Sequence, residues 1–124
     1  MRKLILSFFL VYQSLIPAQH KDTVVFEKGL ASFYAQTFEG RKCSSGDIFH
    51  QNKLTAAHKT LKFGTKVKVI NLKNDSSVIV EINDRLSKKS KCCIDITLKA
   101  AKQLNFVKKG LAMVKIEILK DSLP

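Results

Sequence analysis

Two neighbouring segments of the chain alternate apolar and polar residues one by one, and this pattern constrains the fold more than any other feature. Residues 65–72 (TKVKVINL) place valines on one side and lysines on the other, and residues 77–83 (SVIVEIN) repeat the alternation. The turn residues Asn74 and Asp75 lie between the two segments. The sequence therefore predicts a β-hairpin that buries one face.

Shorter apolar runs, bounded by turn residues, predict the other elements. Strands are expected at 29–35, 93–96 and 110–119. Thr55 is predicted to cap a small helical turn over residues 56–58, and Thr97 is predicted to cap an amphipathic helix over residues 98–104. Five or six short strands with two short helices favour a compact β-barrel in a chain of this size.

The first residues have the features of a secretory signal. Arg2 and Lys3 precede an apolar run at 4–16, and small or polar residues follow it at 17–19. A transmembrane helix needs about 20 apolar residues, and the run at 4–16 is shorter, so no stable membrane span is expected after cleavage. The alternative to a signal is a buried N-terminal helix. We expect a signal peptide at 1–19, a short segment at 20–28 and one domain at 29–120.

A strong excess of positive charge points to an anionic partner. The 124 residues include 22 Lys plus Arg against 10 Asp plus Glu, which gives a formal charge of +12. Export and the lack of aromatic residues among the basic ones argue against nucleic acid. Membrane surfaces and cell-wall polymers remain. The length also excludes a two-domain enzyme built around a large cofactor fold.

Three cysteines are an odd number for an exported protein, which would meet an oxidising compartment. One disulfide and one free thiol are expected. Adjacent Cys92 and Cys93 would point to opposite faces of a strand, so Cys43 is predicted to pair with one of them. A metal site is not expected, because Cys43, His50 and His58 lack the tight paired spacing of a zinc site.

Scarce acidic residues in loops are the best candidates for chemistry. Asp84 follows the strand VIVEIN and precedes Arg85, so it could be a general acid or an ordinary partner of that guanidinium. Spacing alone favours the ion pair. Asp47, taken alone, is typical of a turn residue, and His58, taken alone, is typical of an ordinary structural histidine.

Four segments taken together resemble one known family: GLASFYAQTFEGRKCSSGD, LTAAHKTLKFGTKVKVINL, VIVEINDR and CIDITLKAAKQL. They are similar to the rare lipoprotein A family, peptidoglycan lytic transglycosylases with a six-stranded double-psi β-barrel. The resemblance implies that Asp84 is the catalytic acid and that Asp47 and His58 shape the same groove. It also implies no cofactor and no metal. Three further residues are expected to bind substrate: Tyr34, Asn83 and Arg85.

The resemblance further implies an endolytic enzyme that cleaves the bond between N-acetylmuramic acid and N-acetylglucosamine and leaves 1,6-anhydro ends. The expected partner is the glycan strand of peptidoglycan, met by a monomer in the periplasm or outside a bacterial cell. Protonation of Asp84 near neutral pH would require desolvation or the charge of Asp47, with Arg85 pointing elsewhere.

Three positions depart from the family's usual residues: Asp47 replaces Glu, Cys43 replaces Thr and Leu86 replaces Gly. The shorter reach of Asp47 keeps an alternative open, namely an expansin-like, non-catalytic protein that binds peptidoglycan.

Overall fold

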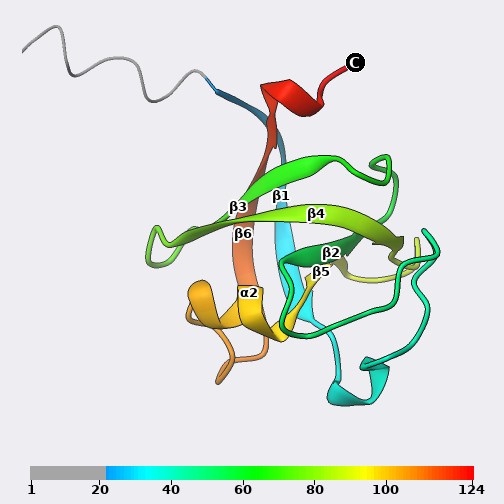
Figure 1. Ribbon diagram of the computed structural model, residues 1–124. Coiled ribbons are helices and arrows are strands. Elements are labelled where there is room, and N and C mark those ends of the chain that lie inside the picture. The colour runs from blue at the N-terminus through cyan, green and yellow to red at the C-terminus, as the bar shows by residue number, and fades with distance from the viewer. Residues whose placement is uncertain (1–21) are drawn as a thin grey trace, which may run out of the picture.

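Six strands close into a barrel in the computed structural model, which describes residues 22–124 (Figure 1). The expected signal at 1–19 lies outside the described residues. The strands follow one another around the barrel in the order β1-β5-β2-β4-β3-β6. Their bounds are β1 Thr23–Phe33, β2 Thr55–His58, β3 Lys66–Asn71, β4 Ser77–Arg85, β5 Cys92–Ile96 and β6 Ala112–Leu119.

The hairpin predicted from the alternation is confirmed. Strands β3 and β4 pair antiparallel, with Val67 opposite Val80 and Val69 opposite Val78. All four valines are buried inside the barrel, and the chain reverses at Asp75, whose φ of 60° lies in the left-handed region. An aspartate tolerates this region better than most residues.

The helical turn predicted for residues 56–58 is wrong, because Thr55–His58 forms strand β2. This strand pairs parallel with β4 and antiparallel with β5. Four residues are too few to show a helical or a strand period, and hydrogen bonds to two neighbouring strands outweigh the helix propensity of alanine. The described residues therefore contain one α-helix, α2 (Leu98–Gln103), and two 3-10 turns, η1 (Gln36–Phe38) and η2 (Lys120–Ser122).

Helix α2 begins where it was predicted to begin. The Thr97 hydroxyl accepts a hydrogen bond from the Ala100 amide at 3.4 Å, as an N-terminal cap does. Ala100 and Ala101 are buried against the barrel, and the lysines of the helix are exposed. Among residues 22–124, no helix is long and apolar enough to cross a bilayer.

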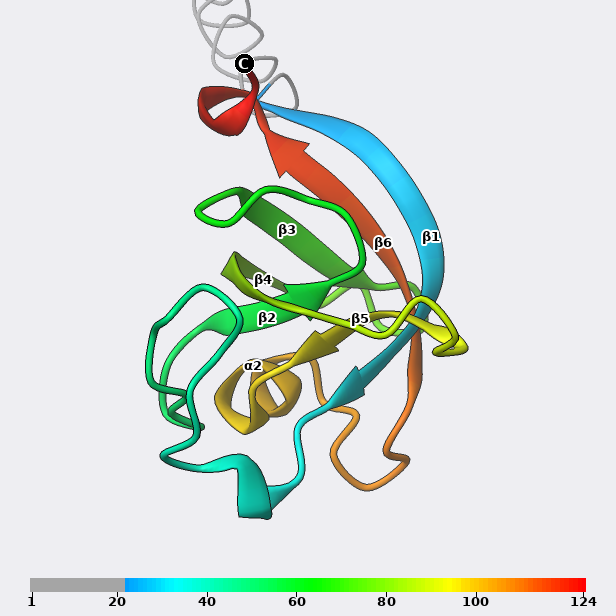
Figure 2. The ribbon, with the colours of Figure 1, turned by 90° about the vertical axis from the view of Figure 1, so that its right-hand side faces the viewer.

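The first strand is longer than predicted. β1 begins at Thr23 rather than at residue 29, and it pairs antiparallel with β6 from Thr23 opposite Leu119 to Ala31 opposite Ala112. Beyond this pairing, the Lys120 amide donates to the Asp22 carbonyl at 2.9 Å. The start of β1 and the end of β6 therefore lie side by side (Figure 2).

Buried side chains form two clusters, one inside the barrel and one outside it. The inner cluster includes Cys93, whereas the outer one consists of Tyr34, Cys43, Phe49 and Ala57. Cys43, Cys92 and Cys93 are all free thiols. The predicted disulfide is therefore wrong, because Cys43 packs with Tyr34 and Phe49 outside the barrel while Cys93 packs in the barrel core.

Candidate active site

Four adjacent strands align a row of side chains across the outer face of the barrel. Ser32 of β1 lies opposite Asp95 of β5, Asp95 opposite Ala57 of β2, and Ala57 opposite Asp84 of β4. Directly opposed residues in a sheet carry their side chains on the same face. The methyl group of Ala57 thus lies between two carboxyl groups.

A β-bulge on β4 brings Asp84 into this row. Ala56 pairs with Ile82, but the next residue, Ala57, pairs with Asp84, so Asn83 is the extra residue of the bulge. Regular pairing would place Asn83 opposite Ala57 and turn Asp84 toward the barrel interior. A bulge redirects side chains in this way, and here it directs the carboxylate outward.

Three donors hold the Asp84 carboxylate. The Tyr34 hydroxyl donates to Oδ2 at 2.6 Å, and the amides of Ser44 and Arg85 donate to Oδ1 at 2.8 and 2.9 Å. Desolvation raises the pKa of Asp84, but the hydrogen bonds from Tyr34, Ser44 and Arg85 outweigh it and keep that pKa below its ordinary value. These donors therefore favour the ionised form of Asp84, whereas a catalytic acid needs the protonated form.

Arg85 points away from the Asp84 carboxylate, as predicted. Its guanidinium lies over the Phe63 ring, 4.2 Å from the centroid, and donates to the His58 carbonyl at 3.1 Å. The same guanidinium also donates to the backbone carbonyl of Asp84 at 3.5 Å, and not to the Asp84 side chain. The ion pair that spacing alone favoured does not form.

The loop after β1 builds one wall of the site. Tyr34 stacks on Phe49 with ring centroids 4.2 Å apart, and the Cys43 amide closes a tight turn by donating to the Asp47 carbonyl at 2.7 Å. Burial, followed by the charges of Asp84 and Asp47, raises the pKa of the Cys43 thiol to about 11. Cys43 is thus a protonated packing residue, and this loop positions the Ser44 amide against Asp84.

A pocket of about 780 Å³ adjoins the loop on its other side. Asp47 and Asn83 both line it, together with Glu81, Lys53 and Lys99 among others. Asn83 is only 5% exposed, and within the described residues its Oδ1 atom has no hydrogen-bond partner. A buried acceptor without a partner is costly, so a donor supplied by a ligand would stabilise this pocket.

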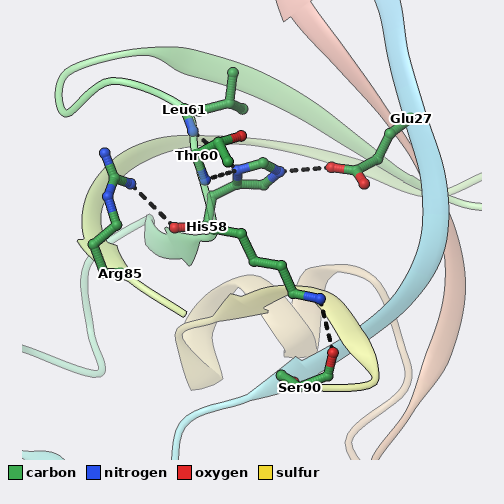
Figure 3. Close-up of polar contacts among 7 residues, drawn as sticks. Glu27, His58, Thr60, Leu61, Arg85 and Ser90 are labelled. Atoms are coloured by element: carbon green, nitrogen blue, oxygen red, sulfur yellow. Dashed lines mark hydrogen bonds and ion pairs between the residues drawn. The ribbon is translucent and has the colours of Figure 1, made fainter. Parts of the chain in front are cut away.

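His58 lies apart from this group, on the opposite face of β2. Its Nε2 atom contacts Glu27 Oε1 at 2.6 Å, and its Nδ1 atom accepts from the amides of Thr60 and Leu61 at 3.1 Å each (Figure 3). With Nδ1 accepting, Nε2 carries the proton and donates it to Glu27. The structure therefore brings Tyr34 and Asp84 together in the outer row, and Asp47 and Asn83 together in the adjoining pocket, but it places the His58 ring in neither.

One carboxyl group of the site was not predicted from the sequence. Asp95 lies in β5 between Ile94 and Ile96, and its Oδ1 accepts from the Ser32 hydroxyl at 3.1 Å. Burial raises the pKa of Asp95 to about 6; the hydrogen bond from Ser32 opposes this rise and the charge of Asp84 adds to it. The available signal was a single acidic residue inside an otherwise apolar strand, CCIDI.

The chain is similar to known proteins over most of the described barrel. A family described as lytic transglycolase matches residues 27–116. The chain is 44% identical over 93 residues to an endolytic peptidoglycan transglycosylase RlpA of Haemophilus influenzae, covering 75% of this chain and 32% of that protein. It is 50% identical over 96 residues to an RlpA of Rickettsia bellii, covering 75% of this chain and 42% of that protein. The chain thus spans less than half the length of these curated relatives.

Two solved structures share the fold at low sequence identity. A Streptomyces papain inhibitor matches with a TM-score of 0.61 and 15% identity, covering 77% of this chain and 97% of that one. A mutant expansin of Clavibacter michiganensis, solved in complex with cellohexaose, matches with a TM-score of 0.61 and 14% identity, covering 82% of this chain and 52% of that one. On its own sequence match and its closed barrel, this chain belongs to the RlpA-like lytic transglycolase family of double-psi β-barrel proteins.

Proposed function

We propose that the protein is a lytic transglycosylase that cleaves peptidoglycan strands endolytically, between N-acetylmuramic acid and N-acetylglucosamine, and leaves 1,6-anhydro ends. The observation that carries this proposal is the Asp84 carboxylate, held by three hydrogen bonds on the outer face of the barrel. Membership of a family described as lytic transglycolase supports it. So do relatives named as endolytic peptidoglycan transglycosylases.

The chemistry requires a carboxylate beside the sugar carbon whose bond breaks. As the bond from C1 of the muramoyl residue to the glycosidic oxygen breaks, that oxygen takes a proton from an acid, positive charge develops at C1, and the ionised Asp84 stabilises this charge. The 6-hydroxyl of the same sugar attacks C1 and transfers its proton to Asp84. No water is consumed, so the product is an internal anhydro ring and not a reducing end.

Substrate contacts are proposed on both sides of the loop that carries Ser44. Tyr34 fixes the orientation of Asp84 through its hydroxyl. The unpartnered Oδ1 of Asn83 suits an amide or hydroxyl donor of the glycan, and Asp47 lines the same pocket. Arg85 is proposed to act at the rim, where its guanidinium covers Phe63. His58 is proposed to position the loop at residues 60–61 and not to touch the sugar.

The location proposed for this activity is the cell envelope. The basic, apolar and small residues at 1–19 would direct export. Removal of this segment takes away Arg2 and Lys3 and leaves a net charge of 12 − 2 = +10, which would attract the chain to an acidic wall. We propose that the exported protein acts as a monomer without a membrane span.

The test is to incubate the protein, without its predicted signal, with glycan strands stripped of peptides and to analyse the fragments by mass spectrometry. Fragments ending in 1,6-anhydro-muramic acid are expected, and Asp84→Asn is expected to abolish them. Asp75→Asn makes the same change in the β3–β4 turn and is the matched control. Reducing ends in place of anhydro ends would contradict the proposal.

A non-catalytic, expansin-like role in binding peptidoglycan is the second candidate. The observation that favours it is the ionised state of Asp84, because the reaction also needs a proton donor for the glycosidic oxygen. Retention of glycan strands on the immobilised protein, with no fragments released, would support this role over the enzyme.

A further inference from the structure

The two carboxyl groups of the outer row differ in how many donors surround them. The Asp84 carboxylate accepts three hydrogen bonds. Within residues 22–124, the Asp95 side chain accepts one, from the Ser32 hydroxyl at 3.1 Å. Donors stabilise the ionised form of a carboxyl group, and burial without donors stabilises the protonated form. Of the two carboxyl groups, Asp95 is therefore the one whose surroundings favour the protonated form.

We propose that Asp95, and not Asp84, is the carboxylic acid that donates the proton to the glycosidic oxygen. The inference rests on the proposed function and assigns its missing proton donor. Asp84 then keeps the roles that suit a carboxylate, stabilising charge at C1 and accepting a proton. When the environments of two carboxyl groups separate their pKa values, the group with the higher pKa serves as the acid and the other as the base.

The placement of the two groups fits one sugar linkage. Asp84 and Asp95 lie on the same face of the sheet and are separated only by β2, where the intervening side chain is the methyl group of Ala57. Two strand spacings of about 4.8 Å place their Cα atoms about 10 Å apart. The side chains extend beyond these Cα atoms on one face, so the carboxyl groups are within range of one linkage, for which other enzymes use carboxyl separations of about 5–10 Å.

The described surroundings of Asp95 contain no cation that would ionise it. From β4 it faces Asp84, whose negative charge opposes ionisation of Asp95. From β1 it faces Ser32, and from the residue just after β1 it faces Tyr34. From β2 it faces Ala57, which carries no charge. Burial and the charge of Asp84 raise the pKa of Asp95 to about 6, in the range that suits a proton donor near neutral pH.

The proton balance of the step closes on these two residues. Asp95 gives its proton to the glycosidic oxygen as the C1–O bond breaks, and the N-acetylglucosamine end leaves with a free 4-hydroxyl. The muramoyl O6 bonds to C1 and passes its proton to Asp84. Asp95 ends ionised and Asp84 ends protonated, and exchange with water restores the starting state.

The location of the proton is tested without turnover by a carbon-13 NMR titration of the aspartate carboxyl groups. Asp95 is expected to titrate near pH 6 and Asp84 below its ordinary range. Assignment comes from loss of one signal in Asp95→Asn and of another in Asp84→Asn. An Asp95 that stays ionised down to about pH 4, the ordinary aspartate range, would overturn the inference, whether or not the protein cleaves glycan.

Activity gives a second, independent test. Asp95→Asn is expected to lower release of anhydro ends by about 10²–10⁴-fold, the usual contribution of a general acid. It should leave nearly unchanged the cleavage of a 2,4-dinitrophenyl glycoside of N-acetylmuramic acid, whose leaving group needs no proton. Equal losses on both substrates, or no loss on glycan, would overturn the inference while the wild-type activity still supported the proposed function.

Ser32→Ala separates a proton donor from a residue that merely supports the fold. It removes the single hydrogen bond that favours the ionised Asp95, so the pKa of Asp95 rises. Activity that needs the protonated acid should then persist to higher pH than in the wild type. Ser77→Ala, at an exposed position on β4, is the matched control and should leave the profile in place. An unmoved profile in Ser32→Ala would contradict the inference.

Discussion

The two faces of strand β2 differ in how completely their polar groups are hydrogen-bonded. On the inner face, His58 has both ring nitrogens bonded, to Glu27 and to two loop amides. On the outer face, Ala57 lies between two carboxyl groups, and the Oδ1 atom of the neighbouring Asn83 has no partner within residues 22–124. The inner face thus satisfies its histidine completely to stabilise the fold, while the outer face gathers two carboxyl groups and one unpartnered amide oxygen beside a small residue.

The largest expected effect comes from the inner face of the barrel. Ile116 of β6 is fully buried, so Ile116→Ala should lower the free energy of unfolding by about 3 kcal/mol through lost burial and a cavity. Urea unfolding measures this loss. Activity per folded molecule should stay the same. A loss of activity in the folded variant would contradict the assignment of the inner face to stability alone.

His58→Ala tests whether the inner-face histidine is structural. The change leaves Glu27 and the amides of Thr60 and Leu61 without their partner, which should cost about 2 kcal/mol of stability. Thermal unfolding gives the stability, and the release of anhydro ends below the melting temperature gives the activity. Unchanged stability with lost activity would place His58 in the chemistry and break the comparison.

Asp95→Asn should make the protein more stable at neutral pH, although it removes the proposed acid. The folded pKa of Asp95 is about 6, above its unfolded value, so the folded state binds more protons and stability falls as pH rises from about 4 to 6. An amide avoids this cost, which is about 1–3 kcal/mol above pH 6. Urea unfolding at pH 7 and at pH 4 should show the gain only at pH 7.

Tyr34→Phe should give the smallest effect, about 1.5 kcal/mol, the low end for a hydrogen bond to a charged group, because the two amide donors to Asp84 remain. The folded pKa of Asp84 is lowered, so its contribution to stability is present above the unfolded pKa and is lost as pH falls through the folded one. Without Tyr34 the pKa of Asp84 rises, so acid unfolding should begin at higher pH. Circular dichroism from about pH 2 to about pH 6, a range that spans the ordinary carboxyl pKa values, measures the midpoint.

Regular local patterns made part of the fold predictable. The alternation in β3 and β4 depends only on one buried face, and the cap at Thr97 depends on neighbouring residues, so both were predicted correctly. Strand β2 was mistaken for a helical turn because its four residues are held by partners in β4 and β5, far away in the sequence. Long-range pairing leaves no local period to detect.

The site could be predicted from the sequence only where a residue type is itself rare and chemically reactive. Asp84 stood out in a chain with few acidic residues, but its outward direction depends on the bulge at Asn83, which no alternation reveals. Asp95 was hidden inside an apolar strand, and its importance emerges only when β5 lies beside β2. His58 was expected in the groove because the family resemblance implied it, and the helical turn predicted for residues 56–58 gave no information about which face of a strand the ring would take.

The adjacent ends of the barrel have a consequence for how such a domain can be used. Because Asp22 and Lys120 are joined by a hydrogen bond, the polypeptide enters and leaves the barrel at one point, away from the loop that carries Ser44. A domain with neighbouring ends can be spliced into a larger polypeptide as a cassette, without stretching its own strands. In the two RlpA relatives described, the matched region makes up only 32% and 42% of the whole, as expected for a portable module.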